Sequence, residues 1–179
     1  MNYGQQRRAH RYYQQALAYL RRYCAAGAVL DVGGGVSMGC RYLAELPGYE
    51  RTCIELPGKG GATLEDVRLI LQDFTSWEPD RPYDAVLCLQ VLEHVDDPTT
   101  FARKLFDCAP VGIISVPYLW PAGSCQYHRH DQIGLDKLRQ WTGREPRESK
   151  VVKEDDGSTR LVAVYRGSHG LPENPQRDR

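Results

Sequence analysis

Three consecutive glycines, Gly33 to Gly35, follow a short apolar run that ends at Asp31 and Val32. Glycine adopts positive φ values and has no Cβ, so a ligand can approach the backbone closely. A strand, a glycine turn and a helix N-terminus together form a common nucleotide-binding arrangement. The competing interpretation is a tight turn without a ligand, because such turns occur in any α/β fold. The residues downstream must decide between the two.

Acidic residues end three successive apolar runs: Asp31, Glu55 and Asp73. In an open α/β sheet, ligands bind at the carboxyl ends of the strands. Glu55 follows Gly33 by roughly 20 residues, the separation at which a carboxylate binds ribose hydroxyls. One such acid alone would be read as a solvated surface group. Three along one edge of a sheet predict a ribose-bearing ligand.

A second cluster of chemically capable side chains lies between Tyr127 and Asp131, after the fifth predicted strand. It contains His128 and His130, and histidine is the commonest general base in proteins. The hypothesis is that His128 or His130 removes a proton from a substrate and that Asp131 orients it. The alternative is that these residues make structural hydrogen bonds within a loop. With Cys125 nearby the ligand types would suit a metal, but the spacing matches no standard site, so no metal is predicted.

The elements that must position these residues alternate along the chain. Apolar runs predict strands over 29–32, 50–55, 67–72, 83–89 and 111–116, and helical patterns cover 5–24, 37–46, a segment starting at 97–98, and 135–142. The runs 149–154 and 159–165 flank Asp156-Gly157, a strong hairpin signal. We therefore expect one doubly wound, mostly parallel α/β sheet with a C-terminal antiparallel hairpin. The domain is predicted over 1–166, with 1–24 as a helix and partial lid, followed by a flexible tail over 167–179.

Composition limits the classes of function. Lysine plus arginine equals aspartate plus glutamate at 23 each among 179 residues, so no overall field attracts nucleic acid or acidic membranes. Six cysteines lie scattered without a Cys-x-x-Cys pair, which favours reduced thiols in a cytoplasmic protein over a disulfide framework. No signal peptide or membrane anchor is visible in the sequence.

The glycine spacing separates two ribose-bearing ligands. A dinucleotide fingerprint, Gly-x-Gly-x-x-Gly, needs a third glycine where this chain has Met38. The bulk of Met38 would crowd a pyrophosphate, which argues against NAD and against a nicotinamide oxidoreductase.

The residues instead resemble the class I S-adenosylmethionine-dependent methyltransferases. Val29 to Gly35 is similar to that family's first motif, and Tyr83 to Val95 is similar to its fourth, of which Leu92-Glu93-His94 is specific for one large small-molecule branch. The resemblance covers roughly 28–116. The chain departs from the family where Ser37 replaces a frequent third glycine, and the segments that usually build an acceptor lid are missing apart from the first helix.

The resemblance implies a Rossmann-like methyltransferase fold, S-adenosylmethionine as cofactor, and a role for each matching residue. Backbone at Gly33, Gly34 and Gly35 approaches the methionine part, Asp31 orders its amino end, Glu55 binds the ribose, the Asp73-Phe74 pair contacts the adenine, and Gln90 lines the methionyl side.

The expected function is methyl transfer to a small-molecule acceptor, most directly an oxygen whose proton the His128 or His130 base removes. An N-methyltransferase and a non-catalytic S-adenosylmethionine-binding partner protein are the alternatives. Neither nucleic acid nor membrane is expected as a partner, and a homodimer that closes the pocket is left open.

Overall fold

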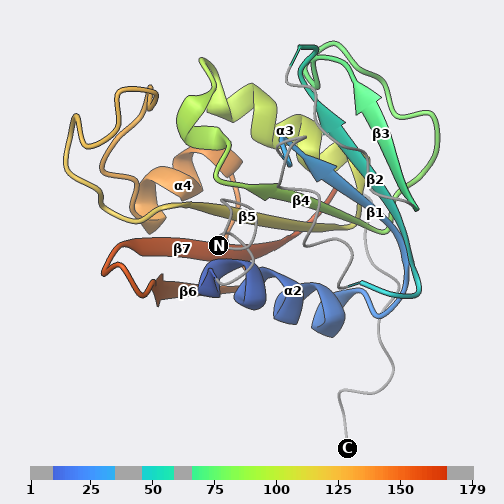
Figure 1. The fold of residues 1–179 in the computed structure, drawn as a ribbon, viewed down its shortest axis with the longest axis horizontal. Coiled ribbons are helices and arrows are strands. Elements are labelled where there is room, and N and C mark those ends of the chain that lie inside the picture. The colour runs from blue at the N-terminus through green and yellow to red at the C-terminus, as the bar shows by residue number, and fades with distance from the viewer. Residues whose placement is uncertain (1–9, 35–45, 59–65, 169–179) are drawn as a thin grey trace, which may run out of the picture.

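The computed structural model describes residues 10–34, 46–58 and 66–168. Within these residues, seven strands form one sheet (Figure 1). The strands are β1 (Gly27–Val32), β2 (Tyr49–Glu55), β3 (Val67–Leu71), β4 (Ala85–Leu89), β5 (Val111–Pro117), β6 (Glu148–Lys153) and β7 (Thr159–Arg166). Their order across the sheet is β3-β2-β1-β4-β5-β7-β6.

The first five strands run parallel, and β7 runs antiparallel to both of its neighbours, β5 and β6. This confirms the predicted doubly wound, mostly parallel sheet with a C-terminal antiparallel hairpin. The strand order reverses beside β1, because β2 and β3 lie on one side of it and β4 and β5 on the other. Ligands of open α/β sheets bind at such a switch point.

Helices cover both faces of the sheet (Figure 1). Helix α2 (Arg11–Tyr23) packs against β5, β6 and β7 on one face, whereas α3 (Pro98–Cys108) and α4 (Leu135–Thr142) pack together on the other. A single 3-10 turn, η2 (Leu92–His94), follows β4. The motif residues Leu92, Glu93 and His94 therefore lie between the end of a central strand and helix α3.

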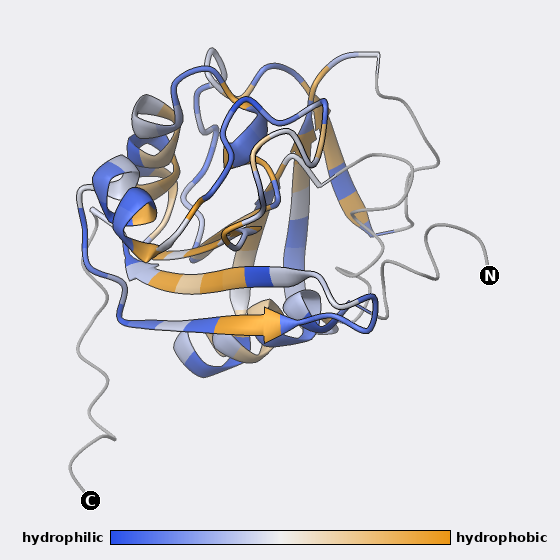
Figure 2. Cartoon of the chain, turned by 90° about the vertical axis from the view of Figure 1, so that its left-hand side faces the viewer, coloured by the Kyte–Doolittle hydropathy of each residue, from blue (hydrophilic) through white to orange (hydrophobic). Residues whose placement is uncertain are grey.

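The strands alternate between two apolar cores. In β5, Ile114 faces the core beneath α3 and α4, and Ile113 faces the core beneath α2. All residues of β4 and β5 are buried, as their continuous apolar runs predict for central parallel strands. Figure 2 shows the apolar stretch of β7 beside the more hydrophilic edge strand β6.

Local sequence signals set the ends of α3 and α4. The Asp97 side chain accepts hydrogen bonds from the backbone N–H groups of Thr99 and Thr100, and Pro98 occupies the first turn. Helix α4 ends at Gly143, which adopts φ 62° in the left-handed region. Both ends agree with the prediction from sequence.

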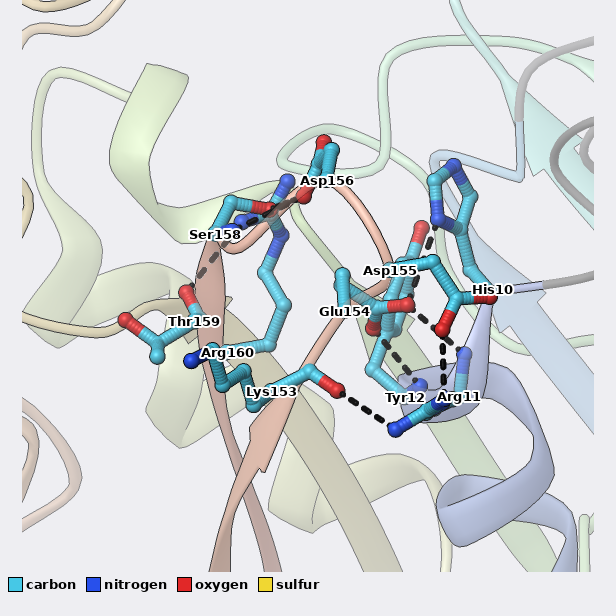
Figure 3. A network of polar contacts seen from close by, with 10 residues as sticks. All are labelled: His10, Arg11, Tyr12, Lys153, Glu154, Asp155, Asp156, Ser158, Thr159 and Arg160. Carbon is cyan, nitrogen blue, oxygen red and sulfur yellow. Dashed lines mark hydrogen bonds and ion pairs between the residues drawn. The ribbon is translucent and has the colours of Figure 1, made fainter.

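The N-terminus of α2 is capped by a residue distant in sequence. Glu154, in the turn between β6 and β7, accepts hydrogen bonds from the backbone N–H groups of Arg11 and Tyr12 at 2.8 and 3.0 Å (Figure 3). His10 lies 3.4 Å from the same carboxylate. Because Glu154 is only 4% exposed, this contact fastens α2 to the hairpin from a buried position.

Some expected elements lie outside the described residues: the helix over 37–46, most of the tail, and the first part of the N-terminal helix. Gly167 and Ser168, expected to begin the tail, donate backbone hydrogen bonds to Pro110 and Phe106. The described cysteines are free thiols, and burial raises the pKa of Cys24 and Cys108 to about 11. Among the helices of the described residues, none combines the length and apolar character needed to cross a bilayer.

Candidate active site

The glycine turn after β1 brings bare backbone to the switch point of the sheet. Gly33 adopts φ +74°, and its backbone N–H donates to the Ile54 carbonyl at 2.9 Å. A Cβ at Gly33 would lie 2.6 Å from Cγ2 of Val91, and one at Gly34 would lie 2.1 Å from Oδ2 of Asp31. Neighbouring side chains therefore leave no room for a Cβ at Gly33 or Gly34. The expected approach of a ligand to this backbone stays a prediction. Gly35 lies outside the described residues.

Two carboxylates mark the edge of the sheet beside this turn. Asp31, next to last in β1, is 1% exposed, and Glu55, the last residue of β2, is 8% exposed. Oε1 of Glu55 accepts a hydrogen bond from the Leu56 backbone at 2.9 Å. Because β1 and β2 pair in parallel with Asp31 opposite Cys53, both carboxylates lie at the same carboxyl edge.

The third acidic position is arranged differently. Asp73 is exposed, and its Oδ1 accepts hydrogen bonds from the backbone N–H and the hydroxyl of Thr75, both at 2.8 Å. These bonds hold the pKa of Asp73 below its ordinary value. The Phe74 ring is buried against Phe101 and Trp77. The Phe74 side chain thus belongs to the core.

Gln90 lies directly after β4 and completes this edge. Its φ of +59° is unusual for a residue with a side chain, and it is held by two hydrogen bonds to Ser115 in β5. The backbone N–H donates to the Ser115 carbonyl at 2.9 Å, and Nε2 donates to the hydroxyl at 3.1 Å. A strained backbone fixed by its neighbours is common at binding sites.

The loop after β5 is fastened onto η2. The backbone N–H groups of Arg129 and His130 both donate to the Glu93 carbonyl, at 2.8 and 3.2 Å. Nδ1 of His94 lies 2.9 Å from the Tyr127 carbonyl, and Nε2 of His130 lies 3.0 Å from that of Val95. His94 therefore holds the loop.

Of the two candidate bases, His128 has the surroundings that suit a general base. Only 6% of its side chain is exposed, and its Nδ1 lies 3.5 Å from Oδ1 of Asp131. The ring lies between His94 and Trp120, with centroids 5.0 and 5.7 Å away. Burial and then the neighbouring His94 lower the pKa of His128 from its ordinary value. His128 is therefore neutral at pH 7.

His130 has a different role in the loop. Its Nε2 is engaged by the Val95 carbonyl, and its ring meets the Trp141 ring edge-on at 5.1 Å. Asp131 also accepts a hydrogen bond from the Gly123 backbone at 2.8 Å, so it is fixed while it faces His128. The structure thus brings Asp131 to His128 and turns His130 toward the α4 side.

A metal ion would find three possible ligands at this place. Glu93, His94 and His128 each offer an atom, and these atoms lie within 4.8 Å of one another. Nε2 of His94 is 3.9 Å from Oε1 of Glu93. Bonds to zinc of about 2.0 Å place tetrahedral ligand atoms only about 3.3 Å apart. The cluster as it stands is wider than such a site.

Residues 3–152 match a family model described as a methyltransferase domain. The chain belongs to this methyltransferase family. No curated protein sequence gives a match.

Solved structures show the same fold. The 1,6-didemethyltoxoflavin-N1-methyltransferase of Burkholderia thailandensis, with its acceptor and S-adenosylhomocysteine bound, is 21% identical, with TM-score 0.64 over 88% of this chain and 78% of that one. The N-methyltransferase NodS of Bradyrhizobium japonicum, in complex with S-adenosylhomocysteine, is 16% identical, with TM-score 0.64 over 87% and 85%. The [4+2]-cyclase SpnF is 16% identical, with TM-score 0.66 over 87% and 80%.

Sequence reasoning about this methyltransferase missed one residue at the same edge, Arg160. Arg160 is the second residue of β7 and lies opposite Pro117, the last residue of β5. Its guanidinium carbon is 4.3 Å from the Trp120 ring centroid and 5.9 Å from that of Tyr12. The only available signal was an arginine at the start of an apolar hairpin strand.

Proposed function

We propose that this methyltransferase transfers a methyl group from S-adenosylmethionine to a small-molecule acceptor, at oxygen, with His128 as general base. The observation that carries the proposal is the glycine turn at Gly33, placed at the switch point of a sheet whose family is that of methyltransferases. Two structural neighbours hold S-adenosylhomocysteine, the product that remains after methyl transfer.

The described edge residues fit this cofactor. The backbone at Gly33 and Gly34 would face the methionine part, Asp31 its amino end, and Glu55 the ribose. Asp73 and the Phe74 backbone would contact the adenine, and Gln90 would line the methionyl side, with Gly35 assigned by its motif alone. A positively charged sulfonium is stabilised near such carboxylates. Bound there, the cofactor supplies an electrophilic methyl group.

The chain's own contribution is orientation and proton removal. Methyl transfer is an in-line displacement, so holding the acceptor oxygen in line with the methyl carbon supplies much of the acceleration. The neutral His128 ring directs Nδ1 toward Asp131, which leaves Nε2 as the atom that accepts the acceptor's proton. Asp131 then stabilises the imidazolium that forms. Burial of His128 excludes water from this transfer.

The assignment predicts different losses for the two histidines. His128→Ala should lower kcat by about 100-fold or more, because general-base catalysis contributes that much. His130→Ala, which removes a loop anchor, should raise the acceptor KM and change kcat far less. Turnover is measured as S-adenosylhomocysteine released per enzyme. Unchanged rates in His128→Ala would contradict the base assignment, and activity lost on adding a chelator would favour a metal at Glu93, His94 and His128.

N-methylation is the second candidate, because two of the neighbours with bound S-adenosylhomocysteine are described as N-methyltransferases. A neutral amine attacks with its own lone pair and needs no base before the displacement. Amine acceptors that turn over equally in wild type and His128→Ala would support this reading. Tight cofactor binding without turnover of any acceptor would support the non-catalytic partner protein, and SpnF shows that this fold also serves other chemistry.

We also infer that neither nucleic acid nor membrane is a partner, since acidic and basic residues balance at 23 each. A cytoplasmic location follows from the reduced-thiol reading of the cysteines. A homodimer closing the acceptor pocket is an arrangement that light scattering with and without acceptor would test.

A further inference from the structure

Arg160 carries a largely buried charge that forms no ion pair with the described residues. Its Nη1 donates to the Thr159 carbonyl at 3.1 Å, while its Nε is buried and has no hydrogen-bond partner among the described residues. Burial lowers the pKa of this guanidinium. Nearby carboxylates offset part of the cost of removing this charge from water, but none of those in the described residues forms an ion pair with it, so the position can still take an anion.

The Arg160 guanidinium lies over two aromatic rings. Trp120 lies on it at 4.3 Å and Tyr12 at 5.9 Å, and Trp120 is itself fixed because its indole N–H donates to the Thr159 carbonyl at 3.0 Å. Trp120 also lies beside the His128 ring, at 5.7 Å. Trp120 therefore lies beside both the guanidinium and the proposed base, and the Arg160 charge is near enough to lower the pKa of His128.

The nearby carboxylates are engaged elsewhere (Figure 3). Glu154 accepts from the α2 backbone at Arg11 and Tyr12, and Asp156 accepts from the backbone and hydroxyl of Ser158 at 2.8 and 2.6 Å. These acids, with Glu93, surround Arg160 with negative charge without pairing with it. This negative charge opposes any anion, and it opposes a dianion such as phosphate more strongly than a single carboxylate, so a carboxylate is the anion that Arg160 can hold more easily.

We propose that Arg160 binds a carboxylate of the methyl acceptor, so that the substrate is a small hydroxy acid. This rests on the proposed function. Nη2–H would donate a charge-assisted hydrogen bond to the carboxylate, because the buried Nε lies out of a ligand's reach. Trp120 and Tyr12 would contact the apolar body of the substrate, and its hydroxyl would reach Nε2 of His128.

Every proton and electron pair of the methyl transfer is then accounted for. The hydroxyl proton passes to Nε2 of His128, and the oxygen lone pair forms the new bond to the methyl carbon. The carbon–sulfur bond breaks with its electron pair going to sulfur. The products are a methyl ether that retains its carboxylate, S-adenosylhomocysteine, and a proton that His128 later returns to solvent.

Acids compared with matched amides test the proposal. Mandelate and the three hydroxybenzoates, with their primary amides, are offered to the enzyme with S-adenosylmethionine. For the acid that the wild type methylates, kcat/KM should exceed that of its amide by about 10- to 100-fold. Arg160→Gln should remove most of this preference, chiefly through the acid's KM, and Arg160→Lys should retain part of it.

Arg166→Gln is the matched control, because Arg166 ends the same strand and is exposed. It should keep the wild-type preference for acids. Equal kcat/KM for acid and amide in the wild type would overturn the proposal. An equal loss for both in Arg160→Gln would overturn it as well, since that pattern indicates a purely structural arginine.

A binding measurement separates this proposal from the proposed function. Hydroxybenzoates and hydroxybenzamides are titrated into protein saturated with S-adenosylhomocysteine. Tighter binding of acids in the wild type, lost in Arg160→Gln, supports the carboxylate site even where no acceptor turns over. Equal binding of acids and amides by the wild type contradicts it, whatever the folding of the variant.

Discussion

His128 combines an imidazole that can accept a proton with a buried environment. Its side chain is almost fully buried beside Asp131, and burial lowers its pKa. A buried imidazole is neutral above its pKa and competent to take a proton. The backbone contacts of Glu93 hold the loop that carries it. The proposed base is thus positioned by a motif on a different segment of the chain.

A pH profile tests this directly. Because the pKa of His128 is lowered from 6.5, kcat/KM should be level near pH 7 and fall only on acidification below pH 6.5. Asp131 raises the pKa of His128, so Asp131→Asn should lower kcat and move the acidic limb to still lower pH. An Asp131→Asn profile with an unshifted limb would show that Asp131 does not act through His128.

The residues of the glycine turn and its acids were predictable because their motif is local. Asp31, Gly33 and Glu55 lie at strand ends that the apolar runs already indicate. Arg160 was not predictable, because its partners come from other parts of the chain. Its position opposite Pro117 follows only from the pairing of β7 with β5, which no short-range pattern specifies.

At the scale of elements, one helix end was predictable from the local sequence and another was not. The end of α4 at Gly143 follows from leucine spacing and a glycine stop, and it was predicted to the residue. The start of α2 has no capping side chain at its own N-cap residue, His10. Glu154 supplies the cap from the β6–β7 turn, so the pairing became visible only in three dimensions.

Removing that cap should loosen α2. Glu154→Ala leaves two backbone N–H groups of α2 without their acceptor and should cost about 1 to 2 kcal/mol of unfolding free energy. Asp155→Ala is the control, because Asp155 is exposed and bonds only the Arg11 side chain at the surface. Urea unfolding measures both. Equal midpoints for the two variants would mean that Glu154 does not stabilise the helix.

At the scale of the molecule, one sheet is shared by two cores. Leu17 belongs to the core under α2, and Leu105 to the core under α3 and α4; both are fully buried. Because β4 and β5 contribute to both cores, unfolding of one core removes packing partners from the other core. The two faces should therefore unfold together.

Leu17→Ala and Leu105→Ala should each lower the unfolding free energy by about 3 kcal/mol through lost burial and a residual cavity. Circular dichroism and tryptophan fluorescence should report one coincident transition in both variants. Leu71→Ala, at a residue 49% exposed, should change little. Separate transitions for the two probes would show that the faces unfold independently.

Calorimetric titration of S-adenosylhomocysteine tests the central claim, that the Gly33 turn binds this cofactor. The wild type should bind it, and NAD should give no heat. Gly33→Ala should weaken binding at least about tenfold, since a Cβ there would meet Val91 at 2.6 Å in a left-handed backbone. Gly143→Ala, equally left-handed but with no atom within 4 Å of the added Cβ, should bind as the wild type does. Binding of NAD in place of S-adenosylhomocysteine, or unchanged affinity in Gly33→Ala, would contradict the account.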